Sequence, residues 1–95
     1  MRVIEIKQKR NQTMPFNGGM GHDYMRAISA EVAGELCGGY PRPRPGHETF
    51  VAIRPDGYGG RNRLSVQNCG GAYYVASADT KVERWPEVFG VRVRP

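Results

Sequence analysis

The two histidines and two cysteines of this sequence are the residues best suited to ligate zinc. Zinc modules bring their ligands together through short spacings, and no pair of these residues shows one. The main expected helix would hold His22 and Cys37 about 20 Å apart, since each helical residue rises about 1.5 Å. We therefore predict no metal site among His22, Cys37, His47 and Cys69. Both cysteines are expected to be reduced thiols, Cys37 at a helix end and Cys69 in a hairpin corner.

Nucleophilic catalysis needs a serine or cysteine that a neighbouring base activates. None of Ser29, Ser65 and Ser77 lies in the sequence context of a nucleophile elbow. A couple of Cys69 and His47 could form in space without leaving a local signature. The lack of a recognisable catalytic frame favours a protein that is not an enzyme and has no catalytic residues.

The glycine-rich segment 18–21 resembles an anion cradle, because backbone N–H groups ahead of a helix favour phosphate. It lacks the lysine and hydroxyl of a phosphate-binding loop and the spacing of a dinucleotide fingerprint. Asp23 would also occupy the first N–H groups and repel an anion. We interpret the segment as a turn that leads into the helix, and we predict no cofactor.

Arginine accounts for 11 of the 14 basic residues, and the net charge is +5. Its planar fork suits phosphate and stacks on rings, although a genome rich in G and C would produce the same bias. The expected loops place arginines beside tyrosines, which is typical of surfaces for single-stranded nucleic acid. The residues predicted to bind a nucleic acid or a nucleoprotein complex are Lys9, Arg10, Tyr40, Arg42, Arg44, Tyr58, Arg61 and Arg63.

Protein binding is the alternative use of these side chains, because arginine and tyrosine are favoured at interface centres. In build alone, the chain resembles the small accessory and inhibitor proteins of phages and mobile elements. That resemblance implies a blocker of a host protein complex, for example of the anti-CRISPR kind, and no motif carries it. A further alternative is a structural subunit that self-associates through an edge strand. The partner and the oligomeric state stay open.

The length of 95 residues suits one small basic α+β domain that covers residues 1–95. No apolar stretch approaches the roughly 20 residues that cross a bilayer. The first seven residues alternate like a strand and include an acid, unlike a signal peptide. We expect no membrane contact and a cytoplasmic protein.

Alternation and turn residues predict a strand, a helix, three strands, a short helix and a final strand. The first strand covers residues 2–9. The helix runs from an N-cap at Asp23 to Gly38, and Gly34 in its interior suggests close approach of a neighbouring backbone. Residues 40–46 alternate proline and arginine, which favours an extended, solvated backbone.

The second half of the chain is expected to be mostly strand. Strands are predicted at residues 48–54, 64–68 and 72–77, the last two joined as an antiparallel hairpin. Asp79 or Thr80 caps a short helix that Pro86 interrupts after Trp85. Residues 91–94 form an edge strand with its arginines outward.

The predicted fold class is α+β, with a small, mostly antiparallel sheet of four to five strands and one main helix packed on one face. The residues expected in the core are Ile4, Ile6, Ile28, Val32, Leu36, Val51, Ile53, Leu64, Val66, Val75, Trp85 and Phe89.

Overall fold

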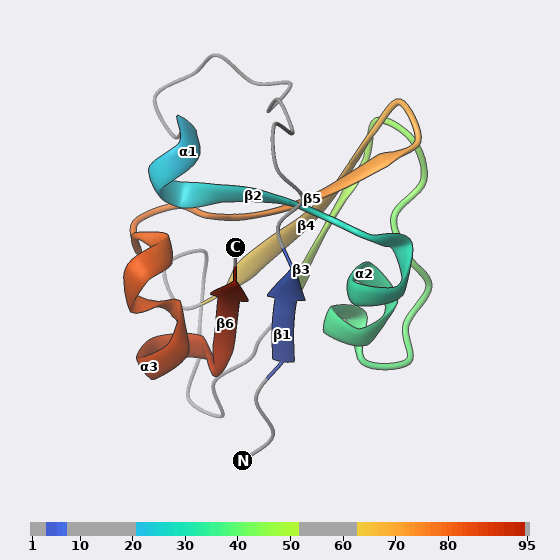
Figure 1. Cartoon of the computed structure of the whole chain (residues 1–95). Coiled ribbons are helices and arrows are strands. Elements are labelled where there is room, and N and C mark those ends of the chain that lie inside the picture. The colour runs from blue at the N-terminus through green and yellow to red at the C-terminus, as the bar shows by residue number, and fades with distance from the viewer. Residues whose placement is uncertain (1–3, 8–20, 52–62, 95) are drawn as a thin grey trace.

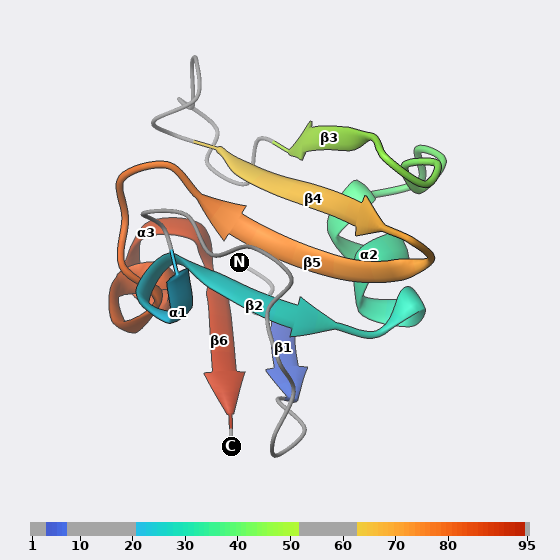
Figure 2. The ribbon, with the colours of Figure 1, turned by 90° about the horizontal axis from the view of Figure 1, so that it is seen from above.

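A four-stranded antiparallel sheet forms the main layer of the computed structural model, which describes residues 4–7, 21–51 and 63–94 (Figure 1). Its strand order is β2-β5-β4-β3. Seen from above, the four strands lie side by side, and the main helix passes behind one end of the sheet (Figure 2). The strands are β2 Met25–Ile28, β3 Glu48–Val51, β4 Leu64–Cys69 and β5 Ala72–Ser77.

A second, two-stranded sheet packs on the helix side of the first. It joins β1 (Ile4–Lys7) to β6 (Val91–Arg94) in parallel, with Ile4 opposite Val91. Figure 1 shows α2 beside β1 and α3 beside β6. The helical elements are α1 Gly21–Tyr24, α2 Ala30–Cys37, the 3-10 turn η2 Val82–Arg84 and α3 Trp85–Phe89.

The predicted fold class is confirmed, because one main helix packs on a four-stranded antiparallel sheet and, apart from the added α1 and β2, the elements follow the expected order. The structure adds a strand, β2, where the first half of the main helix was expected. Met25 and Ile28 fit helical spacing, but their backbone pairs with Ala76 and Tyr73 of β5. Sheet pairing therefore decides between two patterns that the same apolar residues allow.

The main helix begins at Ser29 and not at Asp23. The Ser29 hydroxyl accepts a hydrogen bond from the Val32 backbone N–H at 3.1 Å, which is the usual N-cap arrangement. The expected end is confirmed, since Gly38 adopts a left-handed conformation with φ of 61°. Asp23 instead lies in α1, the short turn ahead of β2.

The short helix also differs from its prediction. Neither Asp79 nor Thr80 caps it: η2 follows Lys81 without a side-chain cap. Pro86 does not interrupt α3 but lies in its first turn, where the missing N–H has no helical partner to lose. α3 ends at Gly90, which adopts a left-handed conformation with φ of 70°.

The β4–β5 hairpin is confirmed. Gly70 and Gly71 form its two-residue loop with φ of 62° and 96°, the left-handed values that match the twist of paired strands. The last strand is also confirmed in position, with Arg92 exposed and Val91 buried, and its partner is β1.

The core lies between the main sheet and the layer of α2, α3 and β6. Seven expected core residues are buried there: Leu36, Val51, Leu64, Val66, Val75, Trp85 and Phe89. Ile28 and Val32 are half-buried at its border, while the side chains of Ile4, Ile6 and Ile53 lie outside the described part. The core also contains Ala33, Cys37, Val82 and Val91, which were not among the twelve expected core residues.

Candidate binding surface

Three segments meet at one end of the main sheet, which we call the turn end. They are the loop 40–47 between α2 and β3, the turn 69–72 between β4 and β5, and the junction 28–30 between β2 and α2. Figure 2 shows α2 and the β4–β5 turn at this end of the sheet. The loop carries two of the predicted arginines, so the geometry of this end decides what they can do.

Asn68 ties the arginine loop to the hairpin. Its side chain is 4% exposed, and Nδ2 donates to the Pro43 carbonyl at 3.0 Å while Oδ1 accepts from the Gly71 N–H at 2.8 Å. Its backbone N–H donates to the His47 carbonyl at 3.1 Å, and its carbonyl accepts from the Gly46 N–H at 2.8 Å. Both amide atoms and both backbone groups of this buried residue are therefore satisfied.

The expectation of a solvated backbone in the loop is wrong at Pro43. This residue is buried, and its carbonyl receives the Asn68 amide. A buried amide donor requires an acceptor, and proline, which has no N–H of its own, still offers its carbonyl. The loop is therefore anchored to the hairpin at its middle.

Arg42 lies against the rest of the molecule. Its Nη1 donates to the Ala30 carbonyl at 3.2 Å, and its guanidinium carbon lies 6.0 Å from the centroid of the Tyr73 ring. A Cβ at Gly34 would meet Arg42 Nη1 at 3.6 Å. The neighbour that Gly34 approaches is thus an arginine side chain and not a backbone. The cation is held in place while it stays exposed.

Arg42 also influences the thiol behind it. Burial raises the pKa of Cys37, and the charge of Arg42 lowers it by a smaller amount. Cys37 is a free, buried cysteine of the core, as expected from its position at the helix end. A thiol with a raised pKa forms little of the reactive thiolate at neutral pH.

The remaining side chains of the loop point to solvent. Tyr40 is 77% exposed, and Arg44 and His47 are exposed as well. Within the described ranges, the Arg44 guanidinium has neither a hydrogen bond nor an ion pair. The exposed carboxylate nearest in the chain is that of Glu48, which directly follows the loop and accepts a hydrogen bond from the Ser65 hydroxyl at 3.0 Å; Glu35 on α2 is the nearest one before the loop. The loop therefore offers one fixed cation, one unrestrained cation and one exposed ring.

Two grooves flank the β4–β5 turn. The first, which we call the notch, has a volume of about 280 Å³ and lies toward β2 and α2. The second has about 330 Å³ and lies toward the loop. The notch is lined by Ala27, Ile28, Ala30, Gly71, Ala72, Tyr73 and Tyr74, and the second groove by Gly46, His47, Glu48, Gln67, Asn68 and Cys69.

Arg63 does not join the turn end. Its guanidinium carbon lies 5.0 Å from the centroid of Phe50, a half-exposed ring on the edge strand β3. In the β3–β4 ladder Glu48 pairs with Gln67 at the turn end, and Val51 pairs with Leu64 at the far end, next to Arg63. Three strand steps separate these pairs, about 10 Å.

Two of the five predicted arginines, Arg42 and Arg44, are thus brought together. Arg63 stands apart at the opposite end of the same strands. Four predicted binding residues, Lys9, Arg10, Tyr58 and Arg61, lie outside the described residues.

Most of the surplus positive charge also lies outside the described residues. The described ranges contain nine of the 14 basic residues but eight of the nine acidic ones. The described residues taken together are therefore nearly neutral, and a basic patch among them depends on local placement.

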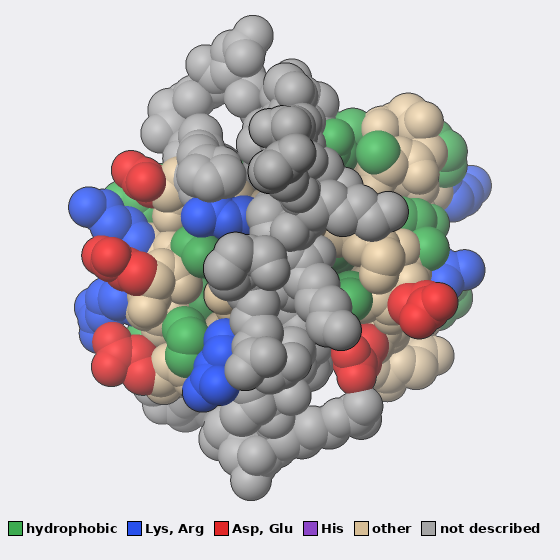
Figure 3. Space-filling view, viewed as in Figure 1, with side chains coloured by type: hydrophobic (Ala, Val, Ile, Leu, Met, Phe, Trp, Pro, Cys, Tyr) green, Lys and Arg blue, Asp and Glu red, His purple; other side chains and the backbone are tan. Residues whose placement is uncertain are grey.

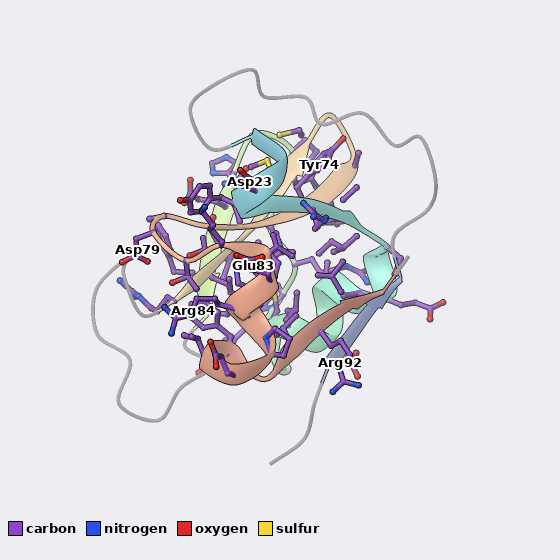
Figure 4. The ribbon with its side chains drawn as sticks, turned by 60° about the vertical axis from the view of Figure 1, so that its left-hand side comes forward. Asp23, Tyr74, Asp79, Glu83, Arg84 and Arg92 are labelled. Carbon is purple, nitrogen blue, oxygen red and sulfur yellow. The ribbon has the colours of Figure 1, made fainter. Side chains whose placement is uncertain are left out.

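A second charged region covers α1, η2, α3 and β6. Figure 3 shows basic and acidic side chains interleaved along this side, and Figure 4 places Asp23, Glu83, Arg84 and Arg92 on it. Arg84 donates to Glu87 at 2.8 Å, and the charge of Asp23 acts on Arg26. Because its charges compensate one another, this side is a weaker candidate for an anionic partner than the turn end.

Sequence reasoning missed Asn68 and Tyr73. A signal for Asn68 was present, because asparagine ahead of a tight turn often accepts a hydrogen bond from the turn backbone. Here Asn68 does so with Gly71. The role of Tyr73 depends on the position of Arg42, 31 residues earlier, and no local pattern shows it.

No three His, Cys, Asp or Glu side chains gather into a possible metal site within the described parts of the chain. His22 and Cys37, expected at two ends of one helix, belong to α1 and α2. No helix among the described residues has the length and apolar character to cross a membrane. Comparison with protein-family models, curated proteins and solved structures gives no match to the chain.

Proposed function

We propose that this chain is a non-catalytic binding protein that holds single-stranded nucleic acid, free or within a nucleoprotein complex, across the turn end. The observation that carries the proposal is the pair Arg42 and Arg44 on one anchored loop. The guanidinium of Arg42 is held over Tyr73, and that of Arg44 beside it is unrestrained. Arginine can contact phosphate with its fork and stack its plane on a base, so such a pair suits a flexible anionic strand.

The exposed tyrosine of the same loop supports this proposal. Tyr40 is one of the two exposed large hydrophobic side chains among the described residues, and a base can stack on its ring. Lys9, Arg10, Tyr58 and Arg61 remain candidates from the sequence and would extend the basic surface. Binding rather than catalysis is favoured by the raised pKa of the Cys37 thiol, which makes it a poor nucleophile.

We place this binding in the cytoplasm. Cys37 and Cys69 are free thiols, as expected for a protein in a reducing compartment.

The test is a fluorescence anisotropy titration with a labelled single-stranded oligonucleotide at low and physiological salt. We compare the wild type with Arg42→Ala/Arg44→Ala and with the control Arg63→Ala/Arg84→Ala, which removes the same charge elsewhere. The turn-end variant should bind at least about tenfold more weakly. Its salt slope should fall by about two, because each of the two arginines neutralises about one phosphate. The control should keep most of the affinity.

Circular dichroism melts of both variants show whether the fold is kept. The proposal fails if the wild type does not bind at low salt, or if the two double variants lose affinity equally. Equal losses would mean that total charge, and not the turn end, determines binding.

A protein-directed inhibitor is the second candidate function, and the exposure of Tyr40 and Phe50 favours it. These rings are 77% and 50% exposed, and exposed aromatic rings often anchor protein interfaces. The double variant Tyr40→Ala/Phe50→Ala would no longer bind a protein partner, and the affinity of the wild type for that partner would change little with salt. Two results together would favour the inhibitor. The immobilised wild type would retain a protein partner that this variant does not retain, and the wild type would not bind the oligonucleotide.

A further inference from the structure

The notch exists because β2 is shorter than the strand beside it. The last residue of β2, Ile28, pairs with Tyr73, whereas Ala72 of β5 has no partner in β2. The chain leaves the sheet at Ser29 to begin α2. At this corner of the sheet β5 therefore has no neighbouring strand, and the notch is the space that is left there.

The notch is lined mainly by small residues. Ala27, Ala30, Gly71 and Ala72 contribute at most a methyl group each, so the space that they line stays open. Its volume of about 280 Å³ lies at the lower limit of small-molecule sites. That size suits a single flat ring system better than a long ligand.

The rim of the notch carries the fixed arginine. Arg42 bonds the carbonyl of Ala30 and lies over Tyr73, and both of those residues line the notch. The Asn68 bridge from Pro43 to Gly71 keeps the loop with Arg44 next to the same turn. A narrow space with a fixed cation at its rim is complementary to a ring that carries a phosphate.

We infer that the notch receives one unpaired nucleobase of a strand whose phosphates lie on Arg42 and Arg44. This inference rests on the proposed function, which it deepens by naming the place of a base. The base enters between the small residues, and its face stacks on the guanidinium plane of Arg42, which is already oriented by Tyr73 and Ala30.

The experiment separates bases from phosphates. The probes are a labelled ten-nucleotide single strand and a strand of the same length and phosphate number whose residues are all abasic. The proteins are the wild type, Ala72→Phe, which fills the notch without a change in charge, and Ala78→Phe as the control. Ala78 is matched to Ala72 in residue type and is exposed just beyond the other end of β5.

The wild type should bind the normal strand roughly tenfold more tightly than the abasic one, the gain expected for a stacked base. Ala72→Phe should remove most of that ratio and leave the abasic affinity unchanged, while Ala78→Phe should keep it. Amide shifts of the isotope-labelled wild type give a second readout. The normal strand, and not the abasic one, should shift Ala27, Ala30 and Ala72.

Three results would overturn the inference. Equal binding of both strands by the wild type would leave the proposed function in place but remove the base from the notch. Amide shifts confined to other parts of the molecule would do the same. If neither strand binds at low salt, the proposed function fails and this inference fails with it.

Discussion

Two arginine–aromatic pairs stand at opposite ends of the β3–β4 ladder, and their surroundings differ. Arg63 lies closer to Phe50 than Arg42 does to Tyr73, at 5.0 Å against 6.0 Å from the ring centroid. Within the described part of the chain, the Arg42 pair adjoins the buried hydrogen bonds of Asn68 and lies at the notch. Contact between an arginine and a ring is therefore common to both ends, and what sets the Arg42 pair apart is the structure that orients it and the space beside it.

The largest effect is expected on breaking the anchor of the turn end. Asn68→Ala would leave the Pro43 carbonyl and the Gly71 N–H without their partner, at a cost of about 3 kcal/mol in the free energy of unfolding. Urea denaturation measures it. Gln67→Ala is the matched neighbour, because within the described ranges its amide makes a single hydrogen bond, from Nε2 to the Ser65 hydroxyl at 3.3 Å, while Oε1 has no partner. A similar loss in both variants would show that the network does not hold this end.

A smaller effect is expected when the fixed cation is removed. Arg42→Ala should lower the free energy of unfolding by about 1 kcal/mol, because it removes the hydrogen bond to Ala30 and the packing on Tyr73. Arg42→Lys keeps the charge but not the planar fork, and should recover only part of the stability. Thermal melts compare the three proteins. Full recovery by lysine would mean that charge alone matters at this position.

The Arg63–Phe50 pair should contribute less to the free energy of unfolding than the Arg42–Tyr73 pair does. A double-mutant cycle of Phe50→Ala and Arg63→Ala is expected to give a coupling of about 0.5 to 1 kcal/mol in the free energy of unfolding, the range for exposed cation–π pairs. Neither single variant should weaken oligonucleotide binding more than about twofold, because this pair is away from the notch. A tenfold loss on Arg63→Ala would move the binding surface to this end.

The smallest change in stability is expected for Arg44. Its guanidinium has no hydrogen bond or ion pair within the described residues, so Arg44→Ala should stay within about 0.5 kcal/mol of the wild type. Its affinity for the oligonucleotide should still fall, with a salt slope lower by about one. A stability loss like that of Arg42→Ala would show that Arg44, too, has a structural role.

The sequence was most informative where local chemistry decides the structure. Gly70 and Gly71 predicted the hairpin because few other residues adopt their φ values, and Gly38 predicted the end of the main helix for the same reason. It misled at Met25 and Ile28, whose spacing fits a helix as well as a strand. Only pairing with β5, more than 40 residues later, separates the two.

The candidate site was predictable in part. Arg42 and Arg44 could be selected from composition and their loop, but not the separation of Arg63, which follows from the register of β3 on β4. The notch could not be predicted, because it arises where β2 ends and that strand was itself not predicted. Long-range contacts of this kind leave no periodic trace in a sequence.

The parallel pairing of β1 with β6 closes nearly the whole chain into one ring. Ile4 and Val91 are partners although 87 positions separate them, and the loss of chain entropy on closing such a span is about 4 kcal/mol. The β4–β5 hairpin closes over two residues and can form early in folding. We expect the ladder of β1 and β6 to form last and to open first, so that its amides exchange with solvent sooner than those of the hairpin.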